Sequence, residues 1–294
     1  MYCNLEELFT EANRLKTGLW RPVLDNEIRL SELSEEQVLG KLDARLSVMQ
    51  GSAGRALEHP CATIGGLIDG VAARQYRYAE TQSGLCGGLL NRVMARALSC
   101  SEVNASMGRI CAAPTAGACG ILPAVLLSVG EKLSLSREQL VRGLLTASGV
   151  GAVIMKNATV SGAEGGCQAE CGTAAAMAAA AAVEMAGGTP GMALHAAAFA
   201  LMNTMGLVCD PVAGLVQVPC AQRNALQAVA ALGAADLALA GMESVIPADQ
   251  VIDAMLRVGR SLPMQLRETA LGGVADTPAG REIAQRIFEN NQQQ

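Results

Sequence analysis

Residues 161–171 read SGAEGGCQAEC and continue through Gly172 and Thr173 into an alanine-rich segment, AAAMAAAAA, at 174–182. Glycine gives the backbone access to positive φ and allows close approaches that a Cβ would block. The alanines let a helix pack tightly against its neighbours, because their side chains are small. The stretch therefore predicts a loop that becomes the start of a tightly packed helix, with a thiol placed to face a cluster rather than a core.

Composition narrows the class of protein. The 294 residues suffice for one large domain or two ordinary ones, and 51% are hydrophobic but only 2% aromatic, so the core must consist of Ala, Leu, Val and Met. A net charge of −5 argues against a nucleic-acid or anionic-membrane surface, since both need clustered Lys and Arg. A membrane-spanning helix needs about 20 apolar residues, whereas Glu184 ends the alanine run and Asp236 interrupts residues 225–241. We therefore expect a small-molecule function.

The N-terminal residues 1–7, MYCNLEE, contain neither the basic nor the apolar region of a signal peptide, so we expect a cytoplasmic protein. The ten cysteines should then be mostly thiols, because disulfides form in oxidising compartments. Spacing alone does not single out a ligand set among ten cysteines. The surrounding sequence has to identify it.

Helix signals cover most of the chain. The capping-box spacing at Ser34–Gln37 and Ser136–Gln139 marks two helix starts, and His59-Pro60 ends the first of these helices. The predicted helices lie at 4–17, 34–58, 71–80, 84–98, 121–129, 136–148, 174–186, 191–205, 218–240 and 247–259, with a short one before the polar tail 290–294. We expect a turn at 20–22, an extended segment at 149–160 and irregular backbone at 61–70 and 261–278.

The domain organisation follows from what the pattern lacks. No βαβ alternation, no internal repeat and no low-complexity linker is found in the sequence. We therefore predict an all-α fold, with residues 1–294 forming a single compact domain of alanine-rich packed helices.

Three loops rich in small residues, at 104–120, 157–172 and 206–220, each end in a helix and each carry cysteine. Glycine in a loop has an entropic cost, so three such loops suggest a compensating use. A loop of this kind also presents unpaired backbone N–H groups at the helix start, which suits a carboxylate. We expect the three loops to converge on one site.

Five motifs resemble those of the iron–sulfur-dependent L-serine dehydratases, or L-serine ammonia-lyases. They are PTAG at 114–117, KNATVSGAEGGCQAE at 156–170, CDPVAG at 209–214, VPCAQRNA at 218–225 and RETALGG at 267–273. The similarity extends from about residue 104 to 280, and the length resembles the separate alpha subunit of the two-subunit type. It implies an oligomeric lyase of amino-acid degradation and gluconeogenesis that converts L-serine, or a similar small amino acid, to pyruvate and ammonia.

The resemblance also implies a cofactor, a [4Fe–4S] cluster held by Cys167, Cys209 and Cys220. Three thiolates on four irons leave one iron open to act as a Lewis acid on the substrate hydroxyl. Cys171, one helical turn after Cys167, has no ligand role in this pattern. Cys111 and Cys119 are interpreted as packing residues. The remaining cysteines, interpreted as ordinary thiols, are Cys3, Cys61, Cys86 and Cys100.

Other candidate site residues lie in the same motifs. One set is expected to hold the substrate carboxylate or ammonium, although its loops could equally be plain helix-capping turns: Thr115, Ala116, Gly117, Asn157, Ser161 and Glu164. A general base must remove the α-proton of the substrate, and the candidates are His59 and Lys156, the latter if burial lowers its pKa. His195 is expected to be a core residue.

Two alternatives remain open. The same cluster chemistry could serve L-cysteine desulfidation, or the chain could be a non-enzymatic helical protein whose loops bind a small anion or a structural metal. Single-chain relatives carry an accessory region and a C-terminal cysteine that can reach the cluster, whereas this sequence ends NNQQQ at 290–294. We therefore expect a separate beta subunit as partner.

Overall fold

The structure, a computed structural model, describes residues 2–81 and 84–292, and within these ranges it contains helices and no strand. The α-helices are α1 (Leu5–Leu15), α2 (Trp20–Ser31), α3 (Glu35–Glu58), α4 (Val71–Glu80), α5 (Gly87–Ala105), α6 (Ile121–Lys132), α7 (Arg137–Asn157), α8 (Gly162–Gly165), α9 (Thr173–Met185), α10 (Pro190–Thr204), α11 (Cys220–Leu239), α12 (Ala248–Ser261) and α13 (Pro278–Gln292). Single turns are η1 (Ala116–Ala118), the π-helical η2 (Gln168–Gly172), η3 (Val212–Gly214), η4 (Met264–Leu266) and η5 (Gly273–Asp276). The all-α prediction is confirmed.

Helix starts follow the predicted caps. The side chain of Asn4 accepts a hydrogen bond from the backbone N–H of Glu7, and both predicted capping boxes form, at Ser34 and at Ser136. Each cap satisfies N–H groups that have no partner inside the helix. The predicted polar tail lies partly in α13, and its residues 293–294 fall outside the described ranges.

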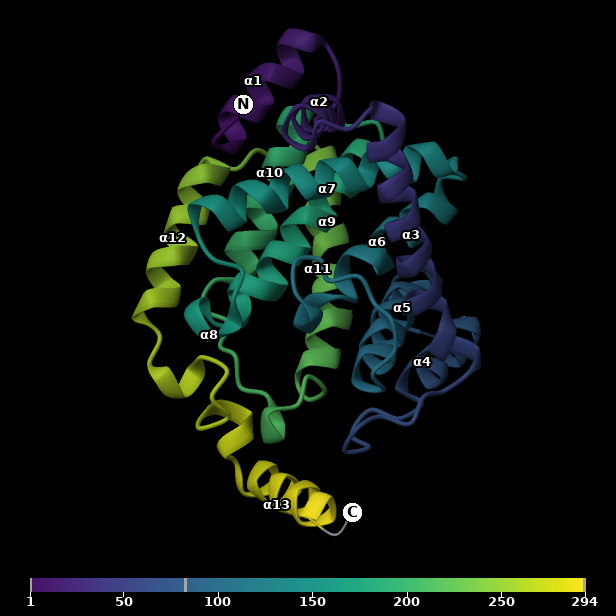
Figure 1. Ribbon diagram of the computed structural model, residues 1–294, viewed down its shortest axis with the longest axis vertical. Coiled ribbons are helices and arrows are strands. Elements are labelled where there is room, and N and C mark those ends of the chain that lie inside the picture. The colour runs from purple at the N-terminus through teal and green to yellow at the C-terminus, as the bar shows by residue number, and fades with distance from the viewer. Residues whose placement is uncertain (1, 82–83, 293–294) are drawn as a thin grey trace.

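The alanine-rich helix α9 runs through the middle of the molecule, where α6, α7, α10 and α11 surround it (Figure 1). Its residues are buried apart from Glu184, which is partly buried. A helix that is apolar on all sides has to lie in the interior, and alanine lets the surrounding helices come close. This helix is the centre of the core, as the alanine run predicts.

Glu184 is the polar exception in this core. One of its carboxylate oxygens accepts a hydrogen bond of 2.9 Å from the backbone N–H of Leu19, in the turn before α2. Burial disfavours the charged form and raises the pKa of Glu184 to about 7. The carboxyl group thus ties the N-terminal helices to the central one.

The turn expected at residues 20–22 is wrong, because these residues form the first turn of α2. Pro22 is compatible with that position, since the first backbone N–H groups of a helix have no acceptor within it. Arg21 also pairs with Asp25 across one turn, at 2.6 Å. The proline therefore marks the beginning of a helix and not a break.

The extended segment expected at 149–160 is also wrong over most of its length, since α7 continues to Asn157. Its glycines serve packing. A Cβ on Gly149 would lie 2.3 Å from Val23 Cγ2, and one on Gly151 would lie 2.7 Å from Met177 Sδ. Glycine is less favourable than alanine inside a helix, but at these two positions its missing side chain allows α7 to pack closely against α2 and α9.

The two ends of the chain lie far apart (Figure 1). Helices α3 and α12 run along opposite edges in Figure 1, while α1 and α13 lie at opposite ends. Helix α13 packs against η3, so the C-terminal segment reaches one of the three loops. None of the helices in the described part of the chain is long and apolar enough to cross a membrane.

Candidate metal centre and active site

Asn224 of α11 joins the first loop to the helix core. Its side-chain amide donates to the carbonyl oxygen of Gly117 at 2.7 Å, and its side-chain oxygen accepts from the backbone N–H of Gly120 at 2.8 Å. Because Asn224 is buried, these bonds are shielded from water. The PTAG loop is therefore fixed relative to the helix that begins at Cys220.

Gln168 joins the second loop to the third. Its backbone N–H donates to the carbonyl of Leu207 at 3.0 Å, and its side-chain oxygen accepts from the N–H of Gly206 at 2.8 Å. Its side-chain nitrogen donates to the carbonyl of Met255 in α12, also at 3.0 Å. This fully buried side chain fixes the residue next to Cys167 to the loop that leads to Cys209.

Two glycines of the second loop allow the close approaches predicted from the sequence. A Cβ on Gly162 would lie 3.0 Å from Cys209 Sγ and 2.5 Å from a carboxylate oxygen of Glu170. Gly166 has a φ of +74°, and a Cβ there would lie 2.8 Å from the carbonyl oxygen of Leu207. Only glycine fits at these two positions without a shift of the surrounding groups.

The third loop is paired with a C-terminal segment. The backbone N–H of Cys209 donates to the carbonyl of Leu266 at 2.9 Å, and the N–H of Glu268 donates to the carbonyl of Cys209 at 2.8 Å. These two bonds make an isolated parallel bridge between Cys209 and Arg267. The RETALGG motif thereby lies beside the cysteine, although they are more than fifty residues apart in sequence.

The three thiols predicted as ligands are near enough to affect one another electrostatically. Burial, together with the charge of the neighbouring Cys167, raises the pKa of the Cys220 thiol to about 12. Burial also raises the pKa of Cys209, with contributions from both other thiols. A metal cation would remove the repulsion among deprotonated thiols, and sulfur donors suit iron–sulfur clusters and zinc. The donor set therefore fits a metal group.

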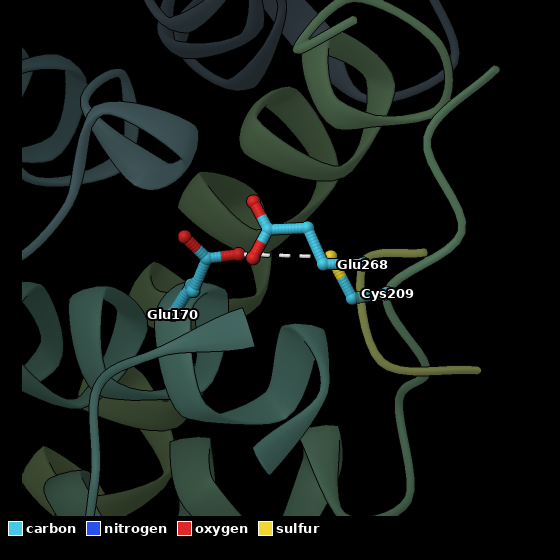
Figure 2. Close-up of side chains that lie close together, drawn as sticks. All are labelled: Glu170, Cys209 and Glu268. Atoms are coloured by element: carbon cyan, nitrogen blue, oxygen red, sulfur yellow. Dashed lines mark hydrogen bonds between the residues drawn. The ribbon is translucent and has the colours of Figure 1, made fainter. Parts of the chain in front are cut away.

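Two carboxylates extend this site. Glu170, Cys209 and Glu268 each offer a ligand atom within 4.8 Å of the other two, and Figure 2 shows both carboxylates and the thiol side by side. Cys209 Sγ donates to Glu170 at 3.8 Å, and the hydroxyl of Thr115 donates to the other oxygen of Glu170 at 2.7 Å. Burial raises the pKa of Glu170, which is 9% exposed. Glu268 is exposed and has a φ of +63°, a strained value for a residue other than glycine.

Arg223, one turn after Cys220, brings positive charge to the site. It pairs with Asp210 at 2.8 Å and donates to the carbonyl of Val208 at 2.7 Å. The side chain of Asp210 is 3% exposed and also accepts from the N–H of Val274 at 2.7 Å. A hydrogen bond from Cys171, followed by the charge of Arg223, lowers the pKa of Cys167. The positive charge of Arg223 thus offsets part of the negative charge of the carboxylates and of any thiolates at the site.

The predicted substrate residues divide into two sets. Thr115 and Gly117 lie in the site, since Thr115 bonds to Glu170 and a Cβ on Gly117 would lie 2.9 Å from the same carboxylate. Ala116, between them, is exposed, and its carbonyl oxygen accepts from the side chain of Asn104 at 3.4 Å. These residues connect the first loop to the second.

The other predicted substrate residues face elsewhere. Asn157 donates to the carbonyl of Cys3 at 2.9 Å, and the carbonyl of Ser161 accepts the N–H groups that begin α8. Glu164 accepts from the hydroxyl of Thr159 at 2.6 Å and lines an outer cavity of about 380 Å³ together with Arg260 and Arg267. Gly162, in the same short helix α8, faces the thiol of Cys209 instead.

The two candidates for a general base are both exposed. Lys156 lies in the last turn of α7, and His59 follows the last residue of α3. Within residues 2–81 and 84–292, neither side chain has a hydrogen-bond or ion-pair partner. His195, which was expected in the core, is only partly buried. Its Nδ1 accepts a hydrogen bond from the backbone N–H of Ser244 at 3.2 Å.

Sequence reasoning missed Glu170, Glu268, Arg223 and Asp210 as site residues, although all four lie in the quoted motifs. Glu170 and Arg223 follow predicted ligands by three residues, a spacing that brings side chains to the same face of a helix. That signal was available. Glu268 gave no such signal, since only the folded chain brings it to Cys209.

Comparison with known proteins identifies the family of this chain. The family of the serine dehydratase alpha chain matches residues 14–275. The chain is 50% identical over 277 residues to the L-serine dehydratase, alpha chain, of Peptoniphilus asaccharolyticus, covering 94% of this chain and 95% of that one. It is 46% identical over 288 residues to a probable L-serine dehydratase, alpha chain, of Bacillus subtilis, covering 98% and 96%.

A longer relative matches as well. The L-serine dehydratase of Haemophilus influenzae is 37% identical over 284 residues, which cover 93% of this chain but 61% of that protein. The family match extends over nearly the whole sequence, and it includes all three predicted ligand cysteines and both carboxylates of the site. The chain belongs to the serine dehydratase alpha chain family.

Proposed function

We propose that this chain is the catalytic alpha subunit of an L-serine dehydratase, which eliminates water from L-serine and yields pyruvate and ammonia. One observation carries the proposal. The second and third loops bring Cys167, Cys209 and Cys220 near enough to shift the pKa of one another, and the carboxylates of Glu170 and Glu268 lie within 4.8 Å of Cys209 Sγ. Membership of the family gives this site its substrate class.

The cofactor that we propose is a [4Fe–4S] cluster held by Cys167, Cys209 and Cys220. When bound with three protein ligands, such a cluster supplies an open iron that acts as a Lewis acid on the leaving hydroxyl. The chemistry of the donors supports this assignment, because thiolates prefer soft metals and iron–sulfur groups to magnesium or calcium. Arg223, paired with Asp210, holds a positive charge next to these thiols.

The chain's own residues would bind and orient the substrate. The carboxylates of Glu170 and Glu268 lie where they can accept hydrogen bonds from the α-ammonium group, since an ammonium has three donors and no acceptor. The loop from Thr115 to Gly117 lies beside Glu170 and offers backbone N–H groups to the substrate carboxylate. Asn157, Ser161 and Glu164 of the second loop contact other groups, so we propose no direct contact with the substrate for them.

A base has to remove the α-proton of serine, and His59 and Lys156 are the residues proposed for this step. An imidazole or an amine that loses its proton can accept one from the α-carbon. Separate His59→Gln and Lys156→Met variants distinguish them, because loss of the base lowers kcat and removes one limb of the pH profile. A variant with an unchanged kcat and profile excludes its residue.

The proposal is tested by anaerobic reconstitution of the purified chain with iron and sulfide, followed by an assay of pyruvate formation from L-serine. We expect serine-dependent pyruvate and an iron content of about four per chain, which is the composition of the proposed cluster. Cys209→Ser should lose both, whereas Cys119→Ser, in a buried thiol outside the site, should keep both. A colourless, air-stable and fully active protein would contradict the proposal.

The same preparation decides between the substrates. L-Serine, L-threonine and L-cysteine differ in the group that leaves, so their relative kcat/KM values separate a dehydratase from a desulfidase. We expect L-serine to be preferred. If pyruvate forms only from L-cysteine, with release of sulfide, the desulfidase replaces the dehydratase. A protein that binds iron but turns over none of the three would be the non-enzymatic alternative.

We also propose a partner and a location. A separate beta subunit would complete the enzyme, because this chain matches 61% of the longer Haemophilus influenzae relative. Adding that subunit should raise kcat or iron retention, and assembly into an oligomer is measured by light scattering. A cytoplasmic location accords with the ten free thiols, because thiols persist in a reducing compartment. A role in amino-acid degradation and gluconeogenesis is proposed from the family.

A further inference from the structure

Cys171 lies against one of the proposed ligands. Its Sγ is 3.3 Å from the Sγ of Cys167, and the two residues are 1% and 3% exposed. Cys171 lies in the π-helical turn η2, Gln168–Gly172, which begins directly after Cys167. A π-helix bonds residues five apart, so side chains four apart come nearly into line along its axis, which brings the two sulfurs together. Such turns are frequent at functional sites.

The surroundings of Cys171 leave its thiol one acceptor. Among the described residues, Cys167 is the only hydrogen-bond partner that the Cys171 thiol has. The side chain is otherwise part of the hydrophobic core that contains α9. An aliphatic residue would fill that space equally well, so what the thiol adds is a sulfur within hydrogen-bond distance of the ligand sulfur. Its S–H can donate to Cys167 once that residue is a thiolate.

We propose that Cys171 is a positioning residue for the cluster: its S–H donates a hydrogen bond to the sulfur of Cys167 while that sulfur is bound to iron. The inference rests on the cluster proposed above and goes beyond it. Hydrogen bonds to ligand sulfurs stabilise the more negative, reduced form of an iron–sulfur cluster. Cys171 therefore raises the reduction potential of the cluster and fixes the orientation of Cys167, without being a ligand.

Three variants test this role in the anaerobically reconstituted chain: Cys171→Ala, Cys171→Val and Cys171→Ser. All three should keep the wild-type iron and sulfide content. In the Ala and Val variants the ratio of reduced to oxidised cluster at a fixed potential should fall by about tenfold, which for one electron corresponds to a shift of about 59 mV. The Ser variant should recover most of this shift, because its hydroxyl is also a donor.

Cys119→Ala is the matched control. Cys119 is also buried, but its thiol donates to the carbonyl of Cys100 and lies in a different hydrophobic cluster. Its variant should leave the midpoint potential unchanged. The potential is followed by the electron paramagnetic resonance signal of the reduced cluster, and a thermal unfolding curve for each variant shows that the chain is folded.

Three results would overturn the inference, and they differ from one another. Equal potentials in wild type and in Cys171→Val would mean that the thiol only fills space. Loss of iron from the folded Ala and Ser variants would make Cys171 a ligand. A wild-type chain that takes up no cluster under any condition would overturn the proposed cofactor as well, and this outcome is visible before any variant is made.

Discussion

Cys100, Cys111 and Cys119, here called the packing cysteines, form one group of thiols, and Cys167, Cys209 and Cys220, the site cysteines, form another. The first group lies among apolar side chains. Its sulfurs bond to neutral partners: Cys119 donates to the carbonyl of Cys100, and Cys100 lies 3.4 Å from the hydroxyl of Ser52. Burial is the largest cause of the raised pKa of all three.

The site cysteines lie among charges. Glu170 and Glu268 are within 4.8 Å of Cys209 Sγ, and Arg223 acts on the pKa of both Cys167 and Cys220. Cys167 comes from the second loop, whereas Cys209 and Cys220 share the third, and Glu268 comes from a further segment near the C-terminus. Buried thiols lie near one another in both groups. What distinguishes the site cysteines is the charged side chains that separate segments bring to them.

The largest expected effect is on iron binding and activity. Cys209→Ser should lower pyruvate formation by well over about 100-fold, because removal of even an outer partner of a metal site costs about 10–100-fold. Cys100→Ser, in the packing group, should stay within a few-fold of wild type. Comparable losses in both variants would erase the distinction between the two groups. Iron content and kcat, measured on the same preparations, check it.

The charge at the site gives the next effect. Arg223→Met leaves the buried Asp210 without its ion pair and should lower the free energy of unfolding by about 3–5 kcal/mol. The exposed pair Arg257–Asp253 is the control, and Arg257→Met should change it by less than about 1 kcal/mol. Urea unfolding of the iron-free chain measures both. Equal small changes would show that the charges around the site cysteines are solvated.

The packing cysteines imply that burial is sufficient to raise the pKa of a side chain in this core. A variant of Glu184 tests this. Its pKa is raised from 4.5 to about 7 in the folded chain, so the folded state holds the proton more tightly than the unfolded state. The stabilising contribution of the protonated form is complete below pH 4.5 and is lost as the pH rises to about 7.

Glu184→Gln should therefore match wild type in stability near pH 5 and exceed it near pH 8 by up to about 3 kcal/mol, since one pKa unit corresponds to about 1.36 kcal/mol. The amide oxygen of Gln can still accept the N–H of Leu19. Urea unfolding of both proteins at the two pH values measures the difference. A difference that is the same at both would contradict burial as the cause.

The smallest expected effect concerns Thr115, which links the first loop to Glu170. Thr115→Val removes the 2.7 Å hydrogen bond and keeps the shape, so it should weaken transition-state binding by about 1.5–3 kcal/mol, the usual range for a bond to a charged group. Thr115→Ser should restore most of kcat/KM. If both variants behave alike, the hydroxyl has no role in the site.

The helices were largely predictable because their signals are local. Capping boxes at Ser34 and Ser136 and the alanine run of α9 each specify structure within a few residues. The two wrong predictions, a turn at 20–22 and an extended segment at 149–160, concern residue types that usually interrupt helices. Pro22 fits the first turn of α2, and Gly149 and Gly151 allow close packing of α7. Such uses depend on neighbours in space and not on the local sequence.

The site was predictable in part. The resemblance implied Cys167, Cys209, Cys220 and Thr115 as site residues. In the structure Cys167 and Cys220 act on the pKa of Cys209, and Thr115 bonds to Glu170. The carboxylate of Glu268 was missed because its position depends on the backbone pairing of Cys209 with the segment around Arg267. A pairing over such a distance in sequence has no local signature, since nothing in the RETALGG motif specifies its partner.

That pairing also determines when the site can exist. A ribosome makes Cys167, then Cys209 and Cys220, and only later the residues 266–274 that bond to Cys209 and Asp210. During synthesis the thiols are therefore exposed to the cell before Glu268 and its strained turn reach them. Glu268 can therefore join Cys209 only after the C-terminal segment has been synthesised and has paired with the third loop.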